Sequence, residues 1–243
     1  MNSSATNKAA LNGWREHQHE HIRVHLSQPV AETRTRWVIE LRRVSAAGSA
    51  PLLDATAGEV IRLAPVLSSS KGPATLRLIA PFHAHDPTRV RLWIADLDVP
   101  GDVLSYAARF GQPIRYDYVP GHWPIEYYQT IFAQEPGSAE MPSAGRAFTR
   151  ALVARLQRLG IAPLVLHTGV GSLDVGEAPY AERYRVPAAT ALAINAARAA
   201  GHRVVAVGTT VVPSGNRGRA RWPRAPGPRL DQSAYHADAW PAR

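Results

Sequence analysis

Two short apolar segments on either side of an alanine-rich stretch constrain the fold of this chain more than any other feature. Residues 161–166 and 203–207 are both expected to form buried strands. The stretch between them carries Pro187, which suits a first helical turn, and Gly201, which suits a helix end. Strand, crossover helix and strand form a βαβ unit with parallel strands and a right-handed crossover. The sequence therefore predicts an α/β domain with a mixed or parallel sheet.

Polar, glycine-rich loops follow both of these expected strands. The first is His-Thr-Gly-Val-Gly-Ser at residues 167–172, and the second is Gly-Thr-Thr at residues 208–210. In open α/β sheets the ligand crevice lies outside the carboxyl ends of the strands. Both loops are therefore expected to line a binding site.

A further helix is expected before the first of these strands. Ser143 can cap its start and Gly160 can end it. Its apolar residues recur at helical spacing, namely Phe148, Leu152, Val153, Leu156 and Leu159.

Residues 13–100 have a different pattern, in which short segments of alternating character are separated by turn-forming residues. The alternation occurs in residues 22–26, 36–43, 59–63, 74–80 and 90–95. Several such strands with no helix between them predict a small antiparallel barrel or a sandwich. After them, Asp102 can cap a helix that runs through Phe110 and ends at Gly111.

Composition limits the chemistry. The absence of cysteine excludes thiol catalysis and cysteine-ligated metal, and it fits a reducing compartment. The net charge is +9, and only Lys8 and Lys71 among the 28 basic residues are lysine. Arginine suits phosphate recognition, but a GC-rich coding sequence would give the same excess, and both interpretations stay open. With no signal-type apolar segment in residues 1–11 and no run of membrane length, a cytoplasmic protein without a membrane partner is predicted.

Histidines at alternate positions raise the question of a metal site. They stand at positions 17, 19, 21 and 25, where several would share one face of a strand. The surrounding run is polar, so an exposed approach to a hairpin is expected and no metal site is predicted. His83 and His85, beside Asp86 and Pro87, are expected to lie in a loop.

Four motifs occur in a fixed order along the second half of the chain. They are Tyr-Gln-Thr at 128–130, Pro-Ser-Ala-Gly at 142–145, and the two loops at 167–172 and 208–210. In this order they resemble the S-adenosylmethionine:tRNA ribosyltransferase-isomerase family of queuosine biosynthesis, and residues 2–6 are similar to an asparagine-rich strand end of that family. The resemblance implies a β-barrel inserted into an α/β domain. We expect the α/β domain to cover residues 1–12 and 101–212, and the barrel 13–100.

The resemblance also implies a reaction. The ribosyl carbons of S-adenosylmethionine, a co-substrate, would pass to the 7-aminomethyl-7-deazaguanine base (preQ1) in a tRNA anticodon arm, giving epoxyqueuosine-tRNA with loss of adenine and methionine. No separate cofactor is expected, and the chain is expected to be a monomer. His167 is the candidate acid/base group, with an ordinary hydrogen-bonded loop residue as the alternative. The expected substrate-binding residues are Tyr128, Gln129, Thr130, Ser143, Ala144, Gly145, Gly169, Gly171, Ser172, Thr209 and Thr210.

The chain also departs from the family pattern. Arg146 and Ala147 stand where the family usually has leucine and histidine, and residues 213–215 cannot begin the helix that follows in the family. An incomplete member, truncated at both ends, is therefore expected. Two alternatives stay open: a noncatalytic nucleic-acid-binding remnant, and a paralogue that uses S-adenosylmethionine on another substrate.

The last 31 residues, 213–243, form a basic segment without apolar periodicity. They hold six arginines and two aspartates. Their composition predicts a disordered tail. A run rich in arginine, proline and glycine is also what a GC-rich message read out of frame would produce, so we expect this segment not to be an evolved part of the fold.

Overall fold

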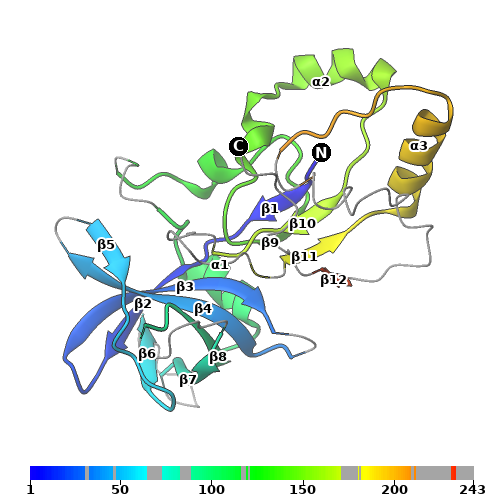
Figure 1. The fold of residues 1–243 in the computed structure, drawn as a ribbon. Helices are drawn as coiled ribbons and strands as arrows, with labels where there is room; N and C mark the ends of the chain where they lie inside the picture. Colours follow the sequence, from blue (N-terminus) through cyan, green and yellow to red (C-terminus); the bar gives the residue numbers. More distant parts are fainter. Residues whose placement is uncertain are drawn as a thin grey trace, which may run out of the picture. The chain divides into compact units, whose positions relative to one another are not determined.

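The computed structural model divides into two units, and one of them is built from two separated stretches of the chain (Figure 1). Unit 1 consists of Met1–Thr6 and Tyr128–Arg243, and unit 2 of Asn7–Tyr127. The structure describes residues 1–30, 33–45, 48–64, 73–82, 89–115, 119, 121–170, 180, 182–208, 211 and the backbone of 231–233. The boundaries expected from the sequence lay near residues 12 and 101, and insertion of the barrel into an α/β domain stays a prediction.

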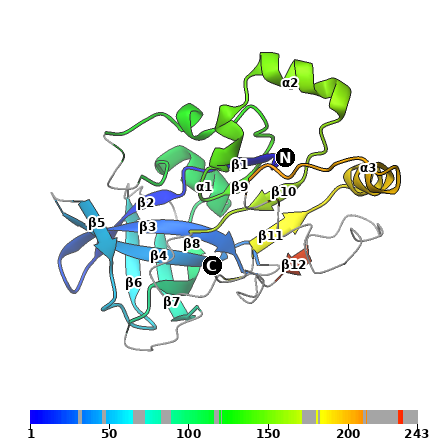
Figure 2. The same cartoon turned by 45° about the horizontal axis from the view of Figure 1, so that its top comes forward.

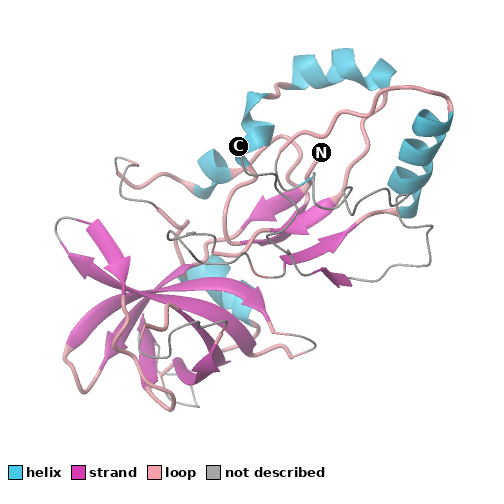
Figure 3. Cartoon of the chain, in the orientation of Figure 1, coloured by secondary structure: helices cyan, strands magenta, loops and turns pink. Residues whose placement is uncertain are grey.

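Unit 2 contains an antiparallel barrel (Figure 3). Its described strands are β2 (Ala10–Arg15), β3 (Glu20–Pro29), β4 (Arg36–Ser45), β5 (Gly48–Pro51), β6 (Val60–Ala64), β7 (Thr75–Pro81) and β8 (Leu92–Asp98). They pair in the order β3-β2-β6-β7-β8-β4-β5, and β3 also pairs with β4. This last pairing closes the described strands into a six-stranded ring, with β5 attached outside it at β4. The predicted barrel is confirmed, and the sandwich alternative is wrong.

Alternation along the strands fills the barrel with aliphatic side chains. In β7, for example, Leu76 and Leu78 are fully buried, whereas Arg77 and Ile79 are exposed. The residues with no exposed surface are Leu11, Val24, Ile39, Leu41, Leu52, Ile61, Leu63, Leu76, Leu78 and Ala95. Successive side chains point to opposite faces of a strand, so the period-two alternation in the sequence marked the residues that form this core.

One buried arginine is neutralised by carboxylates. The Arg15 side chain is 1% exposed, and its guanidinium lies 2.6 Å from Glu59, 3.0 Å from Glu20 and 3.1 Å from Asp54. Burying a guanidinium is costly unless it is paired and hydrogen-bonded, and here three carboxylates from separate parts of the unit supply the pairing.

A second buried network surrounds Glu40, whose side chain is 1% exposed. Its carboxylate accepts hydrogen bonds from Arg42 at 3.0 Å and Arg91 at 3.2 Å, and it lies 3.3 Å from Nδ1 of His25. Burial lowers the pKa of His25, although Glu40 opposes the shift. A neutral imidazole hydrogen-bonded to Glu40 is therefore the resting form.

The other histidines of the 17–25 run lie at the hairpin between β2 and β3. The side chains at 17, 19 and 21 are exposed there, as the sequence predicted. Within the described ranges, no three His, Asp or Glu side chains gather in a way that could hold a metal ion. His83 and His85 lie outside the described residues.

Unit 2 also contains the helix expected after the barrel. Helix α1 (Val103–Phe110) is capped by Asp102, whose side chain accepts a hydrogen bond from the Ser105 backbone N–H at 2.9 Å. The Gly111 N–H donates to Ala107 at 2.7 Å and closes the last turn. The prediction of this helix is confirmed. A short 3₁₀ turn, η1 (Ile125–Tyr128), follows where the chain returns to unit 1.

Unit 1 is built on a mixed set of strands. These are β1 (Ser4–Thr6), β9 (Glu135–Ser138), β10 (Val165–His167), β11 (Glu182–Arg185) and β12 (Asp231–Ser233). β1 pairs in parallel with β9, and Asn2 forms a parallel bridge with Leu164 just before β10. β10, β11 and β12 pair antiparallel in that order. Figures 1 and 2 show β1 beside β9 and β10, but the parallel pair and the antiparallel set are separate sheets joined by the bridge between Asn2 and Leu164. The structure therefore supports an α/β fold that contains a barrel and a small parallel sheet.

The described helical segments of unit 1 are η2 (Ser143–Ala147), α2 (Arg150–Leu156), η3 (Gln157–Leu159) and α3 (Ala188–Ala199). Ile194 of α3 packs with Leu164, Leu166 and Val211 in a small apolar cluster. None of the helices in the described part of the chain is both long and apolar enough to span a membrane.

The prediction of a second strand in the βαβ unit is wrong. Residues 203–207 follow α3 as predicted but form no strand, and Val205 is 78% exposed. The first strand is confirmed only in part, because its ladder covers Val165–His167. The physical reason lies in the ladder itself: β10 pairs with β11 along one edge, while Leu164 at its start bonds to residues 1–3. Both edges of the segment around β10 therefore already have hydrogen-bond partners, which leaves no free edge for residues 203–207.

The helix expected to begin at Ser143 begins later. Residues 143–147 form the 3₁₀ turn η2, and Thr149 caps α2 by accepting a hydrogen bond from the Leu152 N–H at 3.2 Å. Gly160 ends the helical segment, as predicted, with φ +82°, a value that favours glycine. Helix α2 buries none of its residues.

The expectation of a wholly disordered tail is wrong at β12. Residues 231–233 pair with β11, matching Asp231 to Tyr184 and Ser233 to Glu182. Apart from β12, residues 212–243 lie outside the described part of the chain.

Replacing Arg15 tests the charge network of the barrel. Arg15→Ala leaves Glu59, Glu20 and Asp54 without their shared cation, and we expect a loss of about 3 to 5 kcal/mol of unfolding free energy, measured by urea denaturation. Arg62→Ala is the matched control, because the Arg62–Glu16 pair is exposed, with side chains 41% and 56% accessible. Its loss should stay below about 1 kcal/mol. Equal losses in the two variants would contradict the assignment.

Candidate functional site

The first residues of the chain are held between β9 and β10 by side-chain hydrogen bonds. The Asn2 Oδ1 atom accepts from the backbone N–H of Leu166 at 3.0 Å and of Ser4 at 3.1 Å, and its Nδ2 donates to the Leu166 carbonyl at 2.9 Å. The Ser3 N–H donates to the Leu164 carbonyl at 2.8 Å. The asparagine amide thus makes the pair of hydrogen bonds that a neighbouring strand residue would make.

Gln129 of the Tyr-Gln-Thr motif does the same at the other end of β1. Its Oε1 accepts from the Thr6 N–H at 3.0 Å, and its Nε2 donates to the Thr6 carbonyl at 2.8 Å. The Thr6 hydroxyl donates to the Tyr128 carbonyl at 2.7 Å. Gln129 was predicted to bind substrate, and here its amide binds the backbone of the segment that carries β1. Its role in this structure is to hold that segment in place.

Thr130 and Gly145 bring two of the four motifs together. Both are buried. A Cβ atom on Gly145 would lie 2.9 Å from Cγ2 of Thr130, so only glycine allows this approach without a shift. Ser143 and Ala144, in the same turn, are exposed and could contact a ligand.

His167, the candidate acid/base group, is partly buried at the carboxyl end of β10. A Cβ atom on Gly137 would overlap its ring at Nδ1, so the glycine of β9 leaves the space that the imidazole fills. Nδ1 is buried and has no hydrogen-bond partner among the described residues. Burial is the main cause that lowers the pKa of His167, and Arg183 adds to it, whereas Glu135 opposes it. A neutral imidazole is therefore favoured at neutral pH.

Ser138 connects β1 to the loop that follows His167. Its hydroxyl lies against the Ser4 hydroxyl and accepts a hydrogen bond from the Thr168 N–H at 3.1 Å. The Ala139 N–H donates to the Thr168 carbonyl at 2.8 Å. Ser4 and Ser138 have no exposed surface. The start of the glycine-rich loop is therefore fixed from β9.

Glu182 is a site residue that sequence reasoning missed. It begins β11, and its Oε1 accepts a hydrogen bond from the Gly169 N–H at 3.2 Å. Burial raises the pKa of its carboxyl to about 7; the charge of Glu140 adds to the shift, and the Gly169 hydrogen bond opposes it. Residues 182–185 show no alternation in burial, so no clear sequence signal marked this strand.

The predicted site residues separate into three groups. Thr130 and Gly145 meet in one place, and His167 and Gly169 lie at the end of β10, with Glu182 joined to Gly169. Gln129 holds β1, as described above. The predicted site residues outside the described part of the chain are Gly171, Ser172, Thr209 and Thr210.

The described groups can perform acid/base chemistry near neutral pH. A neutral imidazole accepts a proton through its free lone pair, and a carboxyl whose pKa is about 7 can either donate or accept one. The Gly169 N–H donates to Glu182 and holds that carboxyl at the end of β10.

The raised pKa of Glu182 predicts a pH dependence of stability. Because the folded chain holds this proton with a pKa of about 7 against 4.5 in the reference state, the contribution of Glu182 is fully present below about pH 4.5. It is lost as the pH rises through about 7, a change of about 3 kcal/mol before solvent screening. Glu182→Gln keeps the acceptor for Gly169 but cannot ionise.

Urea denaturation of the wild type and of Glu182→Gln between about pH 4 and 8 measures this. The wild type should lose stability relative to the variant across that window. A difference between the two proteins that does not change with pH would show that Glu182 ionises normally in the folded chain.

Comparison with known proteins connects this geometry to a family. The family model described as "Queuosine biosynthesis protein" matches residues 1–216. The chain is similar to the S-adenosylmethionine:tRNA ribosyltransferase-isomerase of Thermus thermophilus, 41% identical over 120 residues, covering 46% of this chain and 35% of the relative. The same-named protein of Paraburkholderia phytofirmans is 36% identical over 174 residues, covering 65% of this chain and 49% of the relative.

A third relative with this name, from Moorella thermoacetica, is 50% identical over 94 residues, covering 35% of this chain and 28% of its own length. The chain thus spans at most about half of the length of these relatives. The family match includes all of unit 2, unit 1 up to residue 216, and every motif described above. The chain therefore belongs to the queuosine biosynthesis protein family.

Proposed function

We propose that this chain acts in the transfer and isomerisation of the ribosyl group of S-adenosylmethionine onto preQ1 in tRNA, which gives epoxyqueuosine-tRNA. The observation that carries the proposal is the grouping of a neutral imidazole, a titrating carboxyl and a glycine N–H at one end of β10. These groups lie within residues 1–216, which the family model matches.

His167 is proposed as the base that removes a proton from the carbon bonded to the sulfonium sulfur. The reaction needs a proton acceptor that is unprotonated at neutral pH, and the lowered pKa of His167 meets that need. Gly137 leaves the space that the ring fills, because a Cβ atom there would overlap Nδ1.

Glu182 and the neighbouring motifs are proposed to bind the co-substrate. S-adenosylmethionine carries positive charge on its sulfur and its amino group, so it favours the ionised form of Glu182. The exposed residues Ser143 and Ala144 form the outer side of the proposed pocket. Tyr128, Gln129, Thr130 and Gly145 support it, and Gly169, Gly171, Ser172, Thr209 and Thr210 complete its proposed binding set.

The proposed partner is the anticodon arm of tRNA, bound by a cytoplasmic monomer. The net charge of +9 supports this assignment, because phosphate contacts dominate the affinity of proteins for nucleic acid. S-adenosylmethionine is proposed as the co-substrate, with no further cofactor.

Release of adenine tests the proposal. The chain is incubated with S-adenosylmethionine and preQ1-containing tRNA, and adenine, methionine and the modified nucleoside are followed by mass spectrometry. His167→Ala should lower the rate at least about tenfold, as expected for loss of a positioned acid/base group, with an unchanged circular dichroism spectrum. His202→Ala, an exposed histidine of the same unit, is the matched control and should leave the rate unchanged.

Each other outcome selects an alternative. Equal rates for His167→Ala and wild type would remove His167 from the chemistry. Binding of tRNA without adenine release would favour a noncatalytic nucleic-acid-binding protein. Adenine release only with a different acceptor would favour a paralogue. The same assay on the Thermus thermophilus relative shows that the substrates are competent.

A further inference from the structure

Several arginines of the barrel form ion pairs with carboxylates inside unit 2. Arg15 is paired with Glu59 at 2.6 Å, Arg36 with Asp96 at 2.7 Å, Arg42 with Glu40 at 3.0 Å and Arg62 with Glu16 at 2.5 Å. A guanidinium paired in this way has little net charge left to offer a partner.

Arg23 and Arg115 differ from these arginines. Arg23 lies on β3, partly buried, and its Nη1 is 3.4 Å from Oε1 of Gln112, a neutral amide. Arg115 donates from Nη1 to the carbonyl of Val119 at 2.8 Å. Among the described residues, neither guanidinium has a carboxylate within ion-pair distance. Burial, and then repulsion from Arg115, lowers the pKa of Arg23. The two guanidiniums therefore share one neighbourhood without a counter-charge.

Backbone hydrogen bonds hold Gln112, which contacts Arg23, close to β2 and β3. The Gln112 N–H and carbonyl exchange hydrogen bonds of 2.9 Å with Ala10 of β2. β2 in turn pairs with β3, where Arg23 lies opposite Asn12. Gln112, three residues before Arg115, is thus joined by backbone hydrogen bonds to the strand that pairs with β3.

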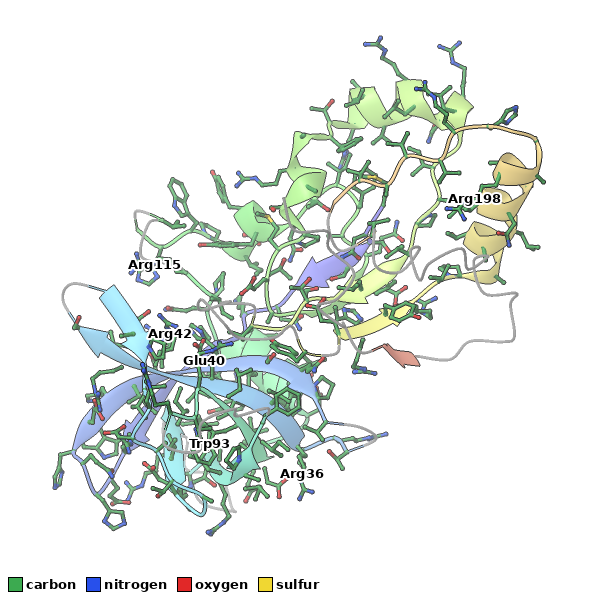
Figure 4. All side chains as sticks on the ribbon, in the orientation of Figure 1. Arg36, Glu40, Arg42, Trp93, Arg115 and Arg198 are labelled. Carbon is green, nitrogen blue, oxygen red and sulfur yellow. The ribbon has the colours of Figure 1, made fainter. Side chains whose placement is uncertain are left out.

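The ladder adds a third arginine. Arg23 lies directly opposite Arg42 of β4, where like charges are unfavourable. Figure 4 shows Arg42 beside Glu40 and Arg115 in the segment after α1. Glu40 is shared between Arg42 and Arg91, so it leaves no counter-charge for Arg23 or Arg115. An arrangement that costs stability in the free protein is relieved when an anion binds.

We propose that Arg23 and Arg115 bind phosphates of the RNA backbone, so that this face of the barrel receives the tRNA substrate. The inference rests on the proposed function. Arginine matches phosphate through its planar fork of donors and is more weakly hydrated than lysine, so a pair of unneutralised arginines fits successive phosphates. The interactions read no base sequence, and they position the anticodon arm on the barrel.

Salt-dependent binding of an anticodon stem-loop tests the assignment. The full chain, Arg23→Gln, Arg115→Gln and the double variant are titrated into fluorescently labelled RNA at several salt concentrations. Removing one arginine–phosphate interaction should reduce the slope of log K against log salt by about 0.7 to 0.9. The double variant should bind about tenfold or more weakly at about 100 mM salt.

Arg62→Gln is the matched control, because Glu16 already neutralises that exposed arginine. It should change affinity less than about twofold. The six arginines of residues 213–243 are present in every variant, so they cancel in the comparison. Thermal melts establish that each variant is folded.

The outcomes separate this inference from the proposed function. A double variant with the affinity and salt slope of the wild type would overturn the surface assignment, whether or not adenine is released. Losses equal to that of Arg62→Gln would overturn it as well. A wild type that binds no RNA would overturn the inference, and if it also releases no adenine, the proposed function fails with it.

Discussion

The hydrogen bonds of the Asn2 side chain organise unit 1. A single amide holds the N–H and the carbonyl of Leu166, and the same oxygen accepts from Ser4. Buried backbone groups left without partners cost about 1 to 3 kcal/mol each, so this one side chain makes up for a missing strand neighbour. The position of β10, and therefore of His167 at its end, depends on it. The side chains of Ser138 and Gln129 also form hydrogen bonds to β1, to Ser4 and Thr6 respectively.

The two units are stabilised in different ways. The barrel closes on itself and fills its interior with aliphatic side chains that have no exposed surface. Unit 1 has a small apolar cluster, while Leu159, Leu192 and Val205 are 81%, 68% and 78% exposed. Polar hydrogen bonds between segments far apart in sequence take a larger share there. A site placed in such a region is sensitive to single polar substitutions, because few apolar contacts compensate.

The pairing of charges follows the same division. Within the barrel, Arg15 and Glu40 are buried with their charges compensated. At the end of β10, Glu182 is partly buried, is affected by the charge of Glu140 and accepts from a backbone N–H, with no cation in ion-pair distance among the described residues. A carboxyl in that setting titrates near neutral pH, which is the property acid/base chemistry needs. The cost to folding is therefore concentrated where the chemistry is proposed.

The sequence predicted the parts of the fold that local rules determine. The barrel strands followed from period-two alternation, and α1 followed from Asp102 and Gly111. Residues 203–207 are apolar enough for a strand but find no free edge beside β10, and edge availability is a property of the whole sheet. The Ser143 side chain could cap a helix, but Gly145 packs against Thr130 within the 3₁₀ turn η2. The helix therefore begins later, with Thr149 as its cap.

The candidate site was predictable only where a motif carried it. His167 and Gly169 stood in a recognisable loop, whereas Glu182 depends on a hydrogen bond from Gly169, 13 residues earlier, and on the charge of Glu140. The structural use of Gln129 could not be inferred either, because its partner Thr6 is 123 residues away. Long-range pairing of polar groups leaves no local pattern in a sequence.

Hydrogen–deuterium exchange of Asn2→Ala tests the central claim most directly. We predict that the amides of residues 164–168 lose protection by at least about tenfold, equivalent to about 1.4 kcal/mol, while the amides of the barrel strands keep theirs. Protection that is unchanged at residues 164–168, or lost equally in both units, would contradict the claim that one side chain holds the strand that carries His167.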